Sequence, residues 1–126
     1  MSVAGHARST YANHAHALKA PRDIEYDMLA RITGRIRDHL PHARGRTPAA
    51  LIAALHDNRR LWTTFAADLA DAGNGFPPEL RARLFYLAEF TLQHTEQVLT
   101  GIATADVLVE INTAVMRGLR GQGASS

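Results

Sequence analysis

The chain contains no cysteine and no long apolar run. Without cysteine there can be no disulfide, thiol nucleophile or thiolate metal site, and the absence is compatible with a reducing compartment. No apolar run approaches the ~20 residues that a membrane span needs. Residues 1–20 intersperse alanine with His, Arg, Asn and Lys, so they lack the apolar core of a signal peptide. We therefore expect a cytoplasmic protein with no membrane association.

An excess of charge of one sign is also missing, because the formal net charge is only +2 over 126 residues. This balance leaves no electrostatic footprint that would by itself indicate direct nucleic-acid binding. A chain of this length forms one domain, large enough to bury about two thirds of its unfolded surface but too small for a second core. We expect it to fold alone or as a small homo-oligomer.

Catalytic and metal-binding patterns are missing as well. The seven histidines are many for this length, but His14 and His16 are two residues apart and so lie on different sides of a helix. No local spacing assembles three metal ligands. There is no serine elbow, glycine-rich phosphate loop or paired-acid motif. The sequence therefore predicts no enzymatic activity, no metal site and no cofactor.

The chain does contain helical periodicity between breaker residues. No segment shows the sustained alternation of β-branched or aromatic residues that indicates a strand. We predict an all-α fold, a small single-domain bundle of about five helices. The expected helices cover roughly residues 3–19, 21–40, 47–72, 77–101 and 106–121.

The two ends of the chain are expected to differ from the bundle. Residues 1–20 have a thin stripe, mostly alanine, and should form a weakly amphipathic helix or an arm that orders on binding. Residues 21–121 form the helical domain, and residues 122–126 are expected to be a frayed tail. The first helix of the domain starts at Pro21. Its expected buried face is formed by Ile24, Met28, Leu29, Ile32, Ile36 and Leu40.

Residues 57–62 are the most informative stretch, because the only tryptophan follows polar residues inside an apolar stripe. Steps of three and four residues place Asn58 and Trp62 on one helix face with Leu51, Leu55, Phe65 and Leu69. An amide buried without partners costs roughly 1 to 3 kcal/mol, so Asn58 should have a partner. Asn112 interrupts a second apolar seam, formed by Leu108, Val115 and Leu119. We predict that the two amides pair in the core in a structural role, and that Trp62 is a core residue.

The segment at residues 77–101 is apolar on nearly all sides. A broad arc that includes Phe85 can fill a bundle core. Tyr86 and Phe90 are four residues apart and point about 160° or more away from the centre of this arc, onto an otherwise polar face. This aromatic pair is a candidate partner-binding site. The alternative is that the N-terminal arm or the fifth helix covers it.

Three short blocks carry the distinctive residues of the chain, at positions 20–25, 57–62 and 111–121. Their key residues are Pro21, Arg22, Asn58, Leu61, Trp62, Ile111, Asn112, Gly118 and Leu119. In this order the blocks resemble those of the FlaF flagellar biosynthesis family. The resemblance extends from about Tyr11 to Gly121, which is nearly the whole chain, and Phe90 also looks like a family position.

The resemblance implies a cytoplasmic factor that is needed for flagellin production and secretion and supports flagellum assembly. Such a factor binds flagellin as a chaperone and acts alongside the regulator FlbT. A small helical bundle with surplus aromatic surface is compatible with this role, because a carrier must shield an apolar flagellin segment that is disordered before assembly. The expected partners are therefore flagellin and FlbT.

The alternative function is post-transcriptional regulation, in which the chain contacts flagellin messenger RNA directly or through a partner regulator. The candidate contacts are two small basic clusters, Arg59 with Arg60 and Arg117 with Arg120, although such pairs are usually solvated helix faces. RNA binding by a basic patch should weaken steeply with salt, whereas binding of a helix by an apolar groove should tolerate salt.

Overall fold

The computed structural model describes residues 26–40 and 47–125 of the chain, with side chains described up to residue 120. In these ranges the chain forms four helices and no strand, which confirms the predicted all-α class. The predicted number of about five helices is one more than the four that these ranges contain. The predicted helix at residues 3–19 and the positions of Pro21 and Arg22 lie outside the described residues.

The first described helix spans residues 26–37 and passes into a turn at residues 38–40. The other three are α3 (Ala49–Ala70), α4 (Pro78–Leu99) and α5 (Asp106–Ser125). α5 continues past Gly121, where the sequence predicted its end. A glycine permits the left-handed conformation that often ends a helix but does not impose it, and in the described ranges positive φ is found at Gly101 alone among the glycines.

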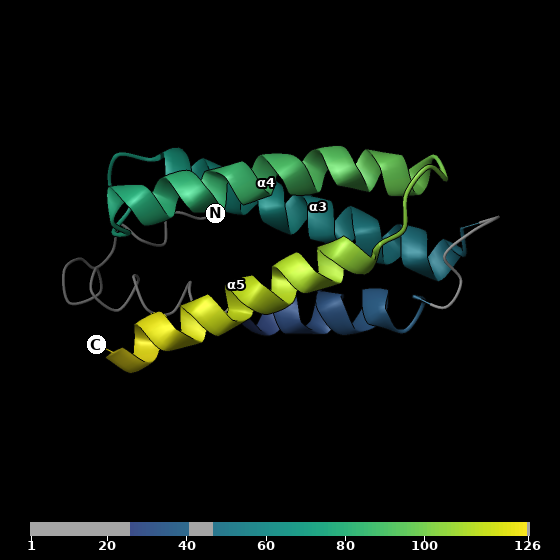
Figure 1. The fold of residues 1–126 in the computed structure, drawn as a ribbon, viewed down its shortest axis with the longest axis horizontal. Coiled ribbons are helices and arrows are strands. Elements are labelled where there is room, and N and C mark those ends of the chain that lie inside the picture. The colour runs from purple at the N-terminus through teal and green to yellow at the C-terminus, as the bar shows by residue number, and fades with distance from the viewer. Residues whose placement is uncertain (1–25, 41–46, 126) are drawn as a thin grey trace, which may run out of the picture.

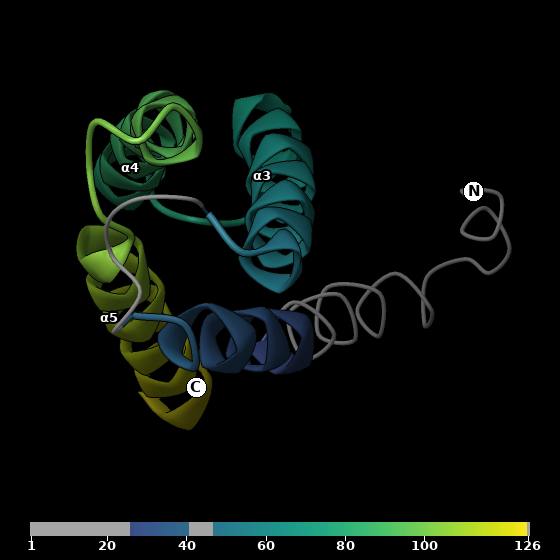
Figure 2. The ribbon, with the colours of Figure 1, turned by 90° about the vertical axis from the view of Figure 1, so that its right-hand side faces the viewer.

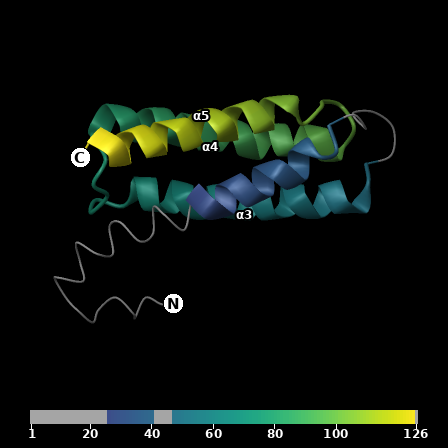
Figure 3. The ribbon, with the colours of Figure 1, turned by 90° about the horizontal axis from the view of Figure 1, so that it is seen from below.

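The helices pack as two antiparallel pairs. α3 and α4 lie side by side and run in opposite directions (Figure 1). α5 runs along the helix at residues 26–37, as the end view also shows (Figure 2). Seen from below, the helix at residues 26–37 crosses α3 (Figure 3). An ion pair of 2.8 Å between Arg35 and Asp57 joins these two helices.

Arg81 of α4 closes the C-terminal end of α3. Its Nε and Nη2 atoms donate hydrogen bonds to the Leu69 carbonyl at 3.0 and 2.8 Å, and Nη2 also donates to the Asp71 carbonyl at 3.2 Å. The last carbonyls of a helix have no partner inside the helix, so a side chain from a neighbouring helix can satisfy them. These bonds set the register between α3 and α4.

The turn after α4 is a Schellman motif. The Ile102 N–H donates to the Gln97 carbonyl at 2.8 Å, and the Gly101 N–H donates to the Val98 carbonyl at 3.1 Å. Gly101 has a φ of 82°, a conformation that side chains disfavour. The motif reverses the chain within a few residues and leads it into α5.

The core consists of two apolar clusters. The first, called the Leu55 cluster, contains Ile32, Ile36, Leu51, Ala54, Leu55, Val98, Ala105, Leu108 and Val109. The second, called the Trp62 cluster, contains Leu29, Trp62, Phe65, Leu69, Leu84, Ala88, Ile111 and Val115. The predicted face of α3 is therefore buried throughout.

Two large side chains that were expected in the core are exposed instead. Met28 is 41% exposed and Phe85 is 38% exposed. On α4 the fully enclosed positions include Ala88 and Thr91, whose small side chains let α3 approach closely. The buried stripe of α4 is narrower than the predicted arc, and Phe85, which lies about 100° from Leu84 around the helix, is left at its edge.

Candidate functional site

Asn112 of α5 lies at the centre of a network of buried hydrogen bonds. Its Oδ1 atom accepts a hydrogen bond from Trp62 Nε1 at 2.9 Å. Its Nδ2 atom donates to Asn58 Oδ1 at 2.9 Å and to Thr33 Oγ1 at 3.0 Å. The exposed fraction of each of these four residues is 1% or less. The predicted pairing of the two amides and the predicted core position of Trp62 are confirmed.

The network joins the helix at residues 26–37 to α3 and α5. It contains amides, a hydroxyl and an indole N–H but no charged group, and it is enclosed on all sides. Such an arrangement offers no nucleophile with an adjacent base and no access for a substrate. A buried amide pair instead fixes how helices align, as polar residues do in coiled-coil seams.

Thr33 was not predicted as a member of this network, whereas Thr91 and Thr95 lie in the arc of α4 that was predicted to face the core. Thr33 Oγ1 accepts from Asn112 and donates to the Leu29 carbonyl at 2.6 Å. On α4, Thr95 Oγ1 donates to the Thr91 carbonyl at 2.6 Å. The available signal was position, because Thr33 lies four residues after Leu29 and three before Ile36, on the same face.

Two buried polar atoms in this region, Asn58 Nδ2 and Thr91 Oγ1, have no hydrogen-bond partner among the described residues. A buried polar group without a partner costs about 1 to 3 kcal/mol. Thr91 and Thr33 are both fully buried threonines, yet only Thr33 has its hydroxyl bonded. A comparison of the two positions therefore separates a bonded buried hydroxyl from an unbonded one.

Replacing Thr91 with valine is expected to keep the free energy of unfolding unchanged or to raise it by about 1 kcal/mol, because the change removes an unpaired hydroxyl. Thr33→Val is expected to lower it by about 1 to 3 kcal/mol, since Asn112 then loses an acceptor. Urea denaturation of the two variants measures both effects. An equal loss in both would show that the Thr91 hydroxyl is bonded.

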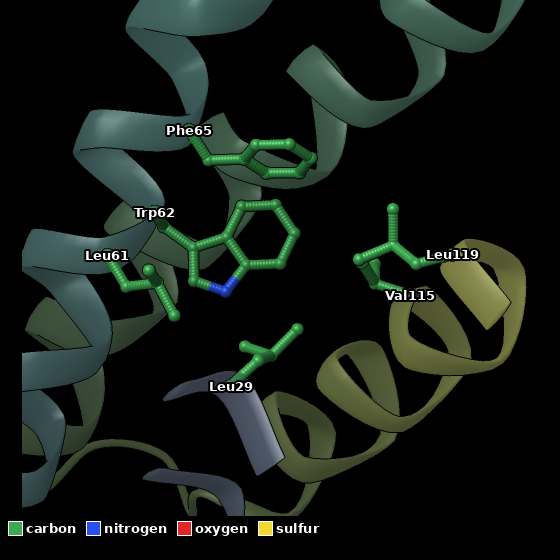
Figure 4. Close-up of a pocket in the computed structure, with 6 residues that line it drawn as sticks. All are labelled: Leu29, Leu61, Trp62, Phe65, Val115 and Leu119. Atoms are coloured by element: carbon green, nitrogen blue, oxygen red, sulfur yellow. The ribbon is translucent and has the colours of Figure 1, made fainter. Parts of the chain in front are cut away.

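A small apolar pocket lies beside the tryptophan ring (Figure 4). It is lined by Leu29, Leu61, Trp62, Phe65, Val115 and Leu119, which come from three helices. The rings of Trp62 and Phe65 meet edge to face, with centroids 5.6 Å apart. The cavity volume is ≈ 10 Å³, which is about the space of one water molecule, so the pocket as it stands holds no larger ligand.

The two members of the predicted aromatic pair of α4, Tyr86 and Phe90, differ in exposure. Tyr86 is 66% exposed, so neither α5 nor any other described segment covers it. Phe90 is half-buried, packs against the Trp62 cluster and stacks on the ring of His94 at 5.4 Å. Phe85 is exposed next to Tyr86 in the sequence. The exposed aromatic surface of α4 is therefore formed by Phe85 and Tyr86, with Phe90 at its inner side.

The predicted arginines lie elsewhere. Arg59 Nη1 is 3.3 Å from Glu96 Oε2. Glu96 follows Tyr86 by ten residues on α4, a distance of about 15 Å along the helix. Arg60 is exposed on α3. The structure therefore does not bring these two arginines together with the exposed aromatic surface.

The second basic cluster faces a different helix. The Arg120 guanidinium lies 5.5 Å above the centroid of the Tyr26 ring and donates a hydrogen bond to the Tyr26 hydroxyl. Arg117 is exposed. Arg59 thus contacts α4 whereas Arg120 contacts the helix at residues 26–37, and the two clusters do not form one patch through these contacts.

The described part of the chain offers no metal-binding cluster, because no group of three His, Asp or Glu side chains lies close enough together. None of the described helices combines the length and the apolar character required to cross a membrane.

Several apolar residues of the distinctive blocks lie around Trp62. Ile111 is buried in the Trp62 cluster, and Leu61 and Leu119 line the pocket. Gly118 is exposed, and a Cβ atom at this position would meet no atom within 4 Å, so nothing in the structure explains the glycine.

Residues 7–119 match a protein family described as flagellar protein FlaF. No curated protein and no solved structure matches the chain significantly.

Proposed function

This chain belongs to the FlaF family of flagellar proteins, and we propose that it is a cytoplasmic secretion chaperone that binds flagellin and supports flagellum assembly. The proposed role is non-catalytic. The regulator FlbT is the proposed second partner. The ligand is the apolar face of a flagellin segment that becomes helical on binding.

The observation that carries this proposal is the exposed aromatic surface of α4. Tyr86 projects from the side of α4 opposite Leu84 and Ala88, which fill the core, and Phe85 lies exposed at the edge of that buried stripe. Interfaces concentrate their binding energy in a few aromatic anchors, and tyrosine is among the residues most enriched there. An apolar-faced helix laid along α4 would bury both rings without disturbing the bundle.

Messenger RNA binding has weaker support. The side chain of Arg59 is engaged by Glu96, and that of Arg120 by Tyr26. The net charge of +2 gives no strong positive field to attract a polyanion. The described contacts therefore favour flagellin binding over RNA binding.

Replacing Tyr86 with serine is expected to weaken flagellin binding by about 2 kcal/mol or more, because the exposed ring acts as an anchor. At roughly 1.4 kcal/mol per tenfold, the dissociation constant should rise more than tenfold. Calorimetry with a flagellin terminal segment measures this change. The free energy of unfolding should change much less, since the ring is 66% exposed.

The matched control is Ile102→Ser, which removes another exposed apolar side chain, 77% exposed, from the turn after α4. This variant should bind as the parent does. Phe90→Ser is unsuitable as a binding test, because Phe90 also packs against the core. Equal binding by the Tyr86→Ser variant and the parent would remove this surface as the contact.

The experiment that tests the function is a pull-down of the full chain from flagellated cells, with and without ribonuclease. The proposal predicts that flagellin is retrieved in both cases. Retrieval of RNA without flagellin, or loss of flagellin after ribonuclease treatment, would refute it and would support the RNA-binding alternative.

A further inference from the structure

A layer of polar residues separates the two apolar clusters of the core. Each of the four described helices contributes to it, and its members are Thr33, Asn58, Thr91, Thr95 and Asn112, the only buried polar residues in the described ranges. On α3, Asn58 lies between Leu55 of one cluster and Trp62 of the other. On α5, Asn112 separates Val109 from Val115 in the same way.

The two ends of the core are closed to different degrees. In the Leu55 cluster only Val109 is more than 5% exposed, whereas in the Trp62 cluster Phe65, Leu84 and Ile111 are. The pocket beside Trp62 lies at the second end. Half-buried apolar side chains also pack against both clusters, and Leu61 contacts both.

The backbone shows the same asymmetry. α5 begins close to the end of α4 and diverges from it toward the C-terminal end of α5 (Figures 1 and 2). At the Leu55 end, the turn between these helices is held by the Schellman bonds and by His94 Nε2, which lies 2.9 Å from the Thr104 carbonyl. At the Trp62 end, α5 is held by the apolar side chains of Val115 and Leu119 and by the exposed hydrogen bond from Arg120 to the Tyr26 hydroxyl.

We propose that the polar layer is a boundary between two cooperative units and that the Trp62 end of the bundle opens while the Leu55 end stays folded. In the open form the C-terminal half of α5 separates from α3, and the helical hydrogen bonds of both segments on the Trp62 side of Asn112 break. The Asn112 level is the limit of the opening. Regions of low packing density open at lower free energy than the core of a protein, and they do so as contiguous units. The inference concerns the chain alone and does not depend on flagellin.

Native-state hydrogen exchange of the full chain in low concentrations of urea tests this. The amides of Phe65 and Val115 should exchange at least about tenfold faster than those of Leu55 and Leu108, which corresponds to about 1.4 kcal/mol. Their exchange should also depend less on urea, because a partial opening exposes less surface than global unfolding. A single urea dependence shared by all four amides would overturn the proposal.

Two valines of α5 provide a matched pair of variants, since Val109 is 8% exposed and Val115 is 5% exposed. Val115→Ala removes contacts that are lost both in the partial opening and in global unfolding. Amide exchange should therefore accelerate by the same factor at both ends of the bundle. Val109→Ala weakens only the unit that stays folded, so exchange should accelerate at Leu55 and remain unchanged at Phe65. Equal acceleration of all amides in both variants, or the reverse pattern, would contradict the assignment.

Discussion

Replacing Trp62 with alanine is expected to lower the free energy of unfolding by about 3 to 5 kcal/mol, the largest effect of any substitution considered. The ring is 1% exposed and packs against Phe65 at the centre of its cluster. Its removal leaves a cavity and deprives Asn112 Oδ1 of its donor. Urea or thermal denaturation measures the loss.

Trp62→Phe separates the loss of apolar volume from the loss of the hydrogen bond to Asn112. Phenylalanine keeps much of the apolar volume and lacks the indole N–H, so we expect a loss of about 1 to 3 kcal/mol. A Trp62→Ala variant that retains full stability but no longer binds its partner would instead place the tryptophan on a binding surface.

Asn112→Ala is expected to lower the free energy of unfolding by about 3 kcal/mol or more, since it leaves Trp62 Nε1 and Asn58 Oδ1 buried without partners. Asn58→Ala should cost only about 1 to 2 kcal/mol, because it leaves one Asn112 hydrogen unpaired and also removes a buried Nδ2 atom that has no partner in the described structure. The ranking of the two variants in a denaturation experiment is therefore itself a test of the network.

The double variant Asn58→Ala/Asn112→Ala completes a thermodynamic cycle. Its loss should be smaller than the sum of the single losses by about 0.5 to 3 kcal/mol, because the hydrogen bond between the two amides is counted in both single variants. Strict additivity would show that the amides do not interact.

The pairing of Asn58 with Asn112 could be predicted because both amides interrupt apolar seams at helical spacing. The same spacing located Leu55, Trp62 and Leu69 on one buried face. Periodicity gives the direction of a side chain from its helix axis, which is sufficient where the seam is narrow and the neighbouring side chains are large.

The width of a buried face could not be predicted, since it depends on how closely the next helix approaches. Phe85 and Met28 are exposed although their positions border buried ones. Phe90 is half-buried because it packs against the Trp62 cluster, although the sequence pattern places it on the polar side of α4. These outcomes depend on tertiary packing, which the spacing along one helix does not contain.

The role of Thr33 could not be read from the sequence for a different reason. A threonine hydroxyl can bond to the carbonyl four residues earlier in its own helix, as Thr33 and Thr95 do. A threonine in an apolar seam therefore needs no partner on another helix. A side-chain amide does, because it has several donors and acceptors. Only the arrangement of the helices shows that Asn112 reaches it.

Calorimetric titration of the purified full chain with a flagellin terminal segment, at about 50 and about 200 mM salt, tests the proposed function most directly. We expect saturable binding with a dissociation constant that changes little between the two salt concentrations, because an apolar contact releases few counterions. No binding at either concentration would contradict flagellin recognition, and an affinity that falls steeply with salt would contradict the apolar aromatic surface as its basis.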